Sequence, residues 1–109
     1  MVIQDMMDKI QYLSSDICYL AVKSILEDIE SDEDCLYSSY QDWIKIKGIC
    51  ENISQKRKKG KRHAISSNQH YCLKLFVVEN ITDVDDLDEL VDKIRELANN
   101  YKYENNLLY

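Results

Sequence analysis

The sequence of 109 residues contains no proline and only two glycines, so it has few of the residues that interrupt regular structure. It has no run of about 18 apolar residues, which is the length that a membrane-spanning helix needs. Its first residues include Asp5 and Asp8, whereas a secretory signal would begin with a basic and then an apolar region. We therefore expect an intracellular, cytoplasmic protein that does not span a membrane, or a nuclear one if the source is eukaryotic.

Residues that carry chemistry are also scarce. The two histidines, His63 and His70, have no acid or evident nucleophile near them in the sequence, so we expect no enzyme. A zinc site would have to combine both of them with Cys50 and Cys72, and that spacing matches no common zinc module. The acidic residues at 83–89 lack the glycine that a calcium-binding loop requires. The sequence thus predicts neither a metal nor a cofactor.

The composition is that of a globular chain, with 45% hydrophobic and 31% charged residues. We expect one domain over residues 1–109, because this length can bury one core. The formal net charge is -6, but the charges are segregated. The basic segment 45–74 has nine Lys or Arg and one acid, a formal charge of +8, and the rest of the chain carries -14. A partner at the basic segment would meet positive charge.

Apolar residues at steps of three and four predict helices over 2–13, 17–29 and 36–47. Gly48 follows the third of these patterns, so we expect a turn there. A short fourth helix is predicted from residue 49 to about 59, with its basic end exposed.

The pattern changes after Gly60. Apolar residues alternate from Tyr71 to Val78 with the two-residue repeat of a strand. The nearest partner is Arg62 to Ser66, joined to it by the polar residues 67–69. These two segments together predict a β-hairpin with one basic arm.

The last predicted element is an amphipathic helix over about 83–99, capped by Thr82, with a tail at 100–109 that docks or frays. Its apolar positions recur at alternating steps of three and four, a spacing suited to the core or to a second copy of the helix. Burial in the core is the simpler interpretation. A homodimer could form through the seam of Val84, Leu87, Val91 and Ile94.

Helices followed by a basic short helix and a basic hairpin predict an α+β, mainly helical fold with a winged helix-turn-helix-like arrangement. In such a fold one helix enters the major groove of duplex DNA and the hairpin contacts the flanking backbone. The sequence therefore predicts a small nucleic-acid-binding protein, regulatory in role, with double-stranded DNA as its partner.

The residues expected to contact nucleic acid form one nearly continuous basic run with flanking polar groups. They are Gln55, Lys56, Arg57, Lys58, Lys59, Lys61, Arg62 and His63. Three other interpretations of the run stay open: a solvated loop, a nuclear-import signal, and a contact for an acidic protein surface. The alternative function is a non-enzymatic interaction module, an inhibitor or adaptor, that uses the acidic helical surface.

Overall fold

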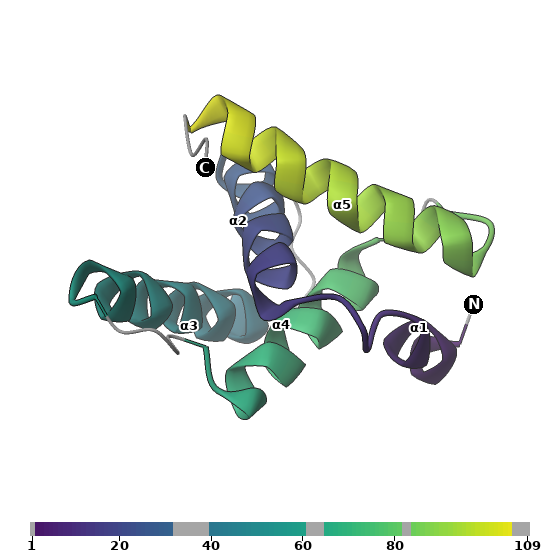
Figure 1. Cartoon of the computed structure of the whole chain (residues 1–109), viewed down its shortest axis with the longest axis horizontal. Coiled ribbons are helices and arrows are strands. Elements are labelled where there is room, and N and C mark those ends of the chain that lie inside the picture. Colours follow the sequence, from purple (N-terminus) through teal and green to yellow (C-terminus); the bar gives the residue numbers. More distant parts are fainter. Residues whose placement is uncertain (1, 32–39, 61–64, 82–83, 106–109) are drawn as a thin grey trace.

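The computed structural model describes residues 2–31, 40–60, 65–81 and 84–105. Within these ranges the chain forms helices that pack around one shared core (Figure 1). The helices are α1 (Ile3–Lys9), α2 (Ser15–Ser31), α3 (Tyr40–Lys58), α4 (Ser67–Asn80) and α5 (Leu87–Glu104).

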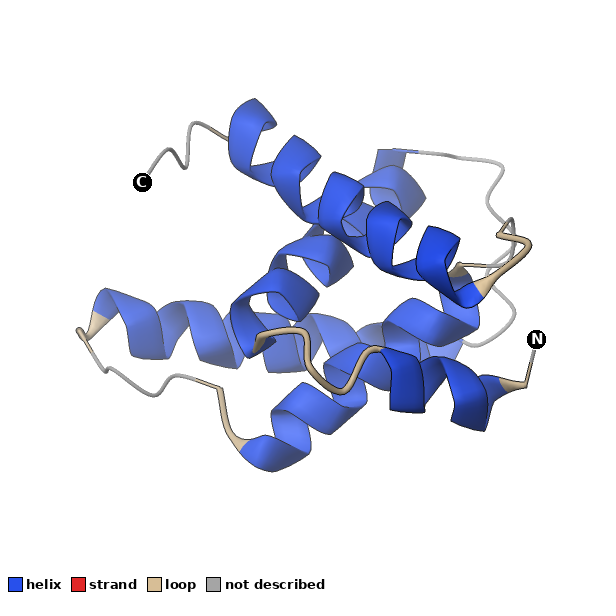
Figure 2. Cartoon of the chain, turned by 45° about the vertical axis from the view of Figure 1, so that its right-hand side comes forward, coloured by secondary structure: helices blue, strands red, loops and turns tan. Residues whose placement is uncertain are grey.

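The prediction of an α+β winged helix-turn-helix is wrong. The described ranges contain helices and loops and no strand, so there is no hairpin wing among them (Figure 2). The first arm of the hairpin was predicted over Arg62 to Ser66. Its first three residues, 62–64, lie outside the described residues. None of the described helices is both long enough and apolar enough to cross a membrane.

The segment predicted as the main strand is helix α4. Ser66 begins it as a capping box: the Ser66 hydroxyl accepts a hydrogen bond from the Gln69 backbone N–H at 3.2 Å, and the Gln69 side chain accepts one from the Ser66 N–H at 3.0 Å. This reciprocal pair satisfies two N–H groups that a helix start leaves free. Residues 67–69, expected to form a hairpin loop, are instead the first turn of the helix.

Helix α4 has apolar side chains on several sides, and other helices cover each of these sides. It contacts α1, α2 and α3, and Leu73, Phe76, Val77 and Val78 are buried. Adjacent positions in a helix point in different directions, so three consecutive buried residues require packing on more than one face. A short, continuous apolar run of this kind is compatible with a buried helix or with a strand.

Helix α5 packs along α2 and supplies Leu90, Ile94 and Ala98 to the core. It begins later than predicted, at Leu87, because Asp86 is the N-cap and accepts a hydrogen bond from the Glu89 N–H at 2.8 Å. It also continues to Glu104, through part of the expected tail.

The residues of the predicted dimer seam belong to the core of the monomer. Ile94 is fully buried, while Val84, Leu87 and Val91 are partly buried and pack against the core. The apolar pattern of α5 therefore reflects burial in the core of the monomer. Dimerisation itself stays a prediction.

Helix α3 runs through Gly48, where a turn was predicted. Its buried residues Ile46, Cys50 and Ile53 continue at steps of four and three across this position. Gly48 lies on the exposed face, so it does not interrupt the apolar stripe. Gly60 is the glycine that follows the helix end, with a φ of 74° in the left-handed region.

We expect Gly48→Ala to stabilise the protein by about 0.5–1 kcal/mol in urea unfolding, because alanine is the better helix residue and a Cβ here meets nothing within 4 Å. Gly60→Ala is the matched control, since its Cβ also meets nothing within 4 Å. It should destabilise by about 1 kcal/mol because of its positive φ. Destabilisation by Gly48→Ala would contradict a continuous α3.

Candidate nucleic-acid interface

The basic run occupies the C-terminal end of α3. Gln55, Lys58 and Lys59 are exposed there, and Lys56 is partly buried. No ion pair joins these three lysines to another residue in the part of the chain that the structure describes. Lys61, Arg62 and His63 lie outside the described residues, although they follow directly in the sequence.

Arg57 differs from its basic neighbours because it has partners in the fold. Its guanidinium is ion-paired with the carboxylate of Asp16, in the first turn of α2. The same guanidinium lies over the ring of Tyr19, 4.7 Å from the ring centroid. Arg57 therefore joins the end of α3 to the start of α2, and a contact with a ligand would compete with Asp16.

Further contacts fix the rest of α3. Lys47 is ion-paired with Glu30, near the end of α2, at 3.1 Å. Asn52 accepts a hydrogen bond from the side-chain amide of Gln69 on α4 at 2.9 Å. Together with the apolar stripe beneath it, these contacts hold α3 in one orientation, which gives the exposed lysines at its end a defined position.

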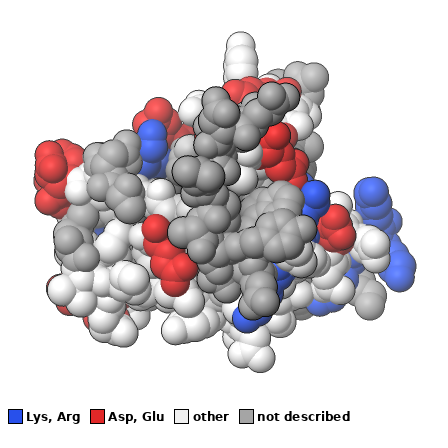
Figure 3. Space-filling model, turned by 180° about the vertical axis from the view of Figure 1, so that it is seen from behind, with Lys and Arg blue, Asp and Glu red and all other residues white. Residues whose placement is uncertain are grey.

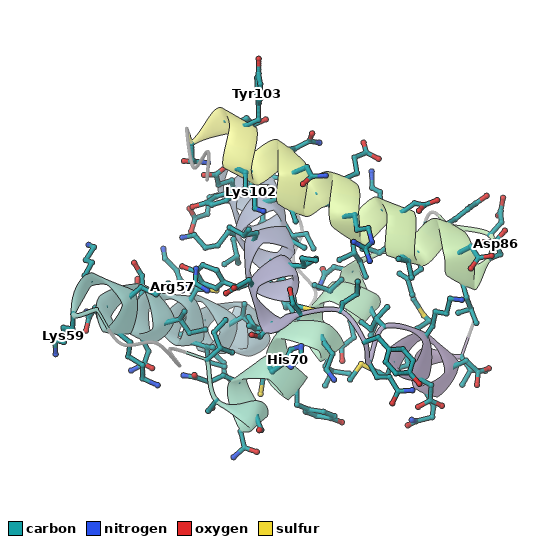
Figure 4. The ribbon with its side chains drawn as sticks, viewed as in Figure 1. Arg57, Lys59, His70, Asp86, Lys102 and Tyr103 are labelled. Carbon is teal, nitrogen blue, oxygen red and sulfur yellow. The ribbon has the colours of Figure 1, made fainter. Side chains whose placement is uncertain are left out.

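The charges that are segregated in the sequence are also segregated in space. Lys59 at the end of α3 and Asp86 at the start of α5 lie at opposite ends of the longest axis of the molecule, which extends 39 Å (Figure 4). In the space-filling view Lys and Arg gather at the corner where α3 ends, with one acidic residue beside them, while the other Asp and Glu residues form patches across the rest of this face (Figure 3). The Debye length at physiological salt is only about 8 Å, so the distant carboxylates hardly weaken the field at the basic end.

The carboxylates at the start of α5 have structural contacts of their own. Asp86 caps the helix, and Glu89 accepts a hydrogen bond from the Asp85 N–H at 2.9 Å. Asp88 is ion-paired with Lys9 of α1 at 3.0 Å. Acidic residues are favoured at this end of a helix by its dipole, so the fold itself accounts for much of the acidic cluster.

Burial shifts the pKa values of the Cys18 and Cys50 thiols and of the His70 imidazole. Burial raises the pKa of the Cys18 and Cys50 thiols to about 11, so both stay protonated at neutral pH. Nε2 of His70 is buried and has no hydrogen-bond partner among the residues that the structure describes. In the described ranges no group of three or more His, Cys, Asp or Glu side chains is placed to hold a metal ion.

The stability of the protein should depend on pH through His70. Burial, and then the charge of Lys74, lower its pKa below the ordinary 6.5, although a backbone hydrogen bond at Leu13 acts in the opposite sense. Between the lowered pKa and 6.5 the folded state binds fewer protons than the unfolded chain. The contribution of His70 to the free energy of unfolding is therefore full above pH 6.5, decreases as the pH falls through this window, and levels off below it.

Urea unfolding between pH 8 and pH 5 measures this effect. We expect His70→Gln to remove part of the loss of stability on acidification. Identical pH profiles for wild type and His70→Gln would contradict the assignment.

No family model matches the chain, and neither does any curated protein or solved structure.

The sequence located the basic end of α3 but not the partners of Arg57. Asp16 and Arg57 are 41 positions apart, and no local pattern relates them. The apolar spacing of α2 does not indicate that Asp16 or Tyr19 faces α3. A contact of this kind is visible only once α2 and α3 are packed together.

Proposed function

We propose that the chain binds double-stranded DNA through the end of α3 and has a regulatory role. The observation that carries the proposal is the position of three lysines: Lys56 and Lys58 lie in the last turn of α3 and Lys59 follows it directly. Figure 4 shows Lys59 at the opposite end of the molecule from Asp86 at the start of α5. Lysine ammonium groups neutralise phosphates and release the counterions bound to them, which supplies affinity for a polyanion. Lys61, Arg62 and His63 would extend the same contact.

The shape of α3 favours duplex DNA over duplex RNA. An α-helix with its side chains is about 10–12 Å in diameter, and the major groove of B-DNA is about 12 Å wide. The major groove of A-form RNA is too narrow for side chains to read. The exposed amide of Gln55, one turn before Lys59, is the group best placed to contact a base edge, because glutamine can pair with adenine.

A simpler explanation of the basic run is that it stabilises the end of α3. Cations are favoured in the last turn of a helix, where the dipole is negative, and Lys56, Arg57 and Lys58 lie in that turn. This effect falls off within one turn of the helix end. It does not account for the continuation of the run through Lys61 and Arg62, which lie beyond Gly60.

Fluorescence anisotropy with a labelled DNA duplex of about 20 base pairs, between 50 and 200 mM NaCl, tests the proposal. Replacing Lys56, Lys58 and Lys59 with alanine should weaken binding and make the slope of log affinity against log salt shallower by about 0.9 for each lost contact, or about 2.7 in all. The matched control replaces Lys93, Arg95 and Lys102 of α5 with alanine, which changes the net charge equally at another place.

Two results would contradict the proposal. One is absence of duplex binding by the wild type at 50 mM NaCl. The other is an equal loss of affinity in the control, which would mean that net charge alone determines binding. A duplex RNA of the same sequence, measured in parallel, tests the preference for DNA.

The alternative is an inhibitor or adaptor that presents its acidic surface to a basic protein. It is the weaker proposal because Asp86, Asp88 and Glu89 at the start of α5 already have partners within the chain. A labelled lysine-rich peptide in place of the duplex distinguishes the two. Peptide binding that is lost on neutralising these carboxylates, without duplex binding, would favour the adaptor.

A further inference from the structure

The contact between Arg57 and Tyr19 has the form of a site for an anion. Tyr19 is almost fully buried, with 7% of its surface exposed, so its ring is a fixed platform. Arg57 lies with its guanidinium over this ring, which leaves the N–H groups at its edge free to donate. A guanidinium held in this way donates in a fork geometry that suits a carboxylate or a phosphate.

In this structure the anion is Asp16. Its carboxylate receives a hydrogen bond from Nη2 of Arg57, and its side chain is 69% exposed. The Arg57 side chain is itself 34% exposed, so a group arriving from solvent could reach it. Exposed ion pairs of this kind contribute little to stability, which means that another anion could displace Asp16 at small cost.

We propose that Arg57 and Tyr19 form a phosphate-binding subsite that Asp16 closes. This inference rests on the proposed function, because the phosphate it assigns is that of a DNA duplex bound at the end of α3. Asp16 keeps Arg57 from contributing to binding and places a negative charge beside the lysines. In the wild type the DNA phosphates are then contacted by the lysines alone. The affinity for DNA is therefore lower than it would be if Arg57 also contacted a phosphate.

The test is a set of four proteins: wild type, Asp16→Asn, Arg57→Gln and the double variant. Asparagine keeps the size of the aspartate and removes its charge. Asp16→Asn should bind the labelled duplex several-fold more tightly, with a salt slope steeper by about 0.9, because one more phosphate is neutralised. Arg57→Gln alone should leave the slope unchanged, and in the double variant the slope should return to the wild-type value.

A titration with inorganic phosphate gives a readout that does not depend on DNA. In Asp16→Asn the NMR signal of the Arg57 Nε–Hε group should shift saturably with phosphate, whereas in wild type the same shift should need several-fold more phosphate. The ring of Tyr19 should keep the guanidinium in place in both proteins. Urea unfolding of the four proteins shows whether the substitutions leave the fold intact.

The two proposals fail in different ways. If wild type and Asp16→Asn both fail to bind the duplex, but Arg57 in Asp16→Asn responds to phosphate, the subsite stands and the proposed function is wrong. If the wild type binds the duplex and Asp16→Asn has the same salt slope, the subsite is wrong. A gain in affinity that persists in the double variant would also overturn it, since the gain would then not require Arg57.

Discussion

The burial of helices α2 and α4 is the constraint on which the arrangement of the other helices depends. The apolar side chains of α4 point in several directions, and α1, α2 and α3 each cover part of them. Helix α2 is buried at five consecutive positions, 18–22, and packs on α3, α4 and α5. Burial of apolar surface is the dominant favourable contribution to folding, so the helices with apolar side chains on several sides take enclosed positions. Helix α5 then completes the core by packing along α2. The orientation of α3, and with it the position of the lysines, follows from these contacts.

Much of the helical structure could be predicted from the sequence, because the regions of α1, α2 and α5 show the spacing of helices with one buried face. The fold class could not. The run from Tyr71 to Val78 alternates like a strand and is also continuously apolar, so its periodicity could not distinguish a strand from an enclosed helix. The capping box of Ser66 and Gln69 was the one local signal that favoured a helix. The predicted turn at Gly48 was wrong for a related reason: the sequence does not distinguish a glycine on the exposed face of a helix from one that ends a helix.

The candidate site was predictable as a cluster of charges but not as a structure. A run of cations in the sequence does not show which of them are free and which have partners. Packing α2 against α3 gives Arg57 a carboxylate and an aromatic ring, while Lys58 and Lys59 stay exposed at the end of the helix. The basic run therefore has two physical roles: one arginine joins two helices, and the lysines around it provide a positive surface that the distant carboxylates do not cancel.

The most direct test of the account is a ¹H–¹⁵N NMR titration of the protein with a DNA duplex at low salt. The account predicts that the largest changes in amide chemical shift occur at residues 55–59, with smaller ones at the start of α4, which is hydrogen-bonded to α3 through Gln69. The amides at the start of α5 should not change. Changes centred on α5, or no changes anywhere, would contradict the claim that the end of α3 is the binding surface.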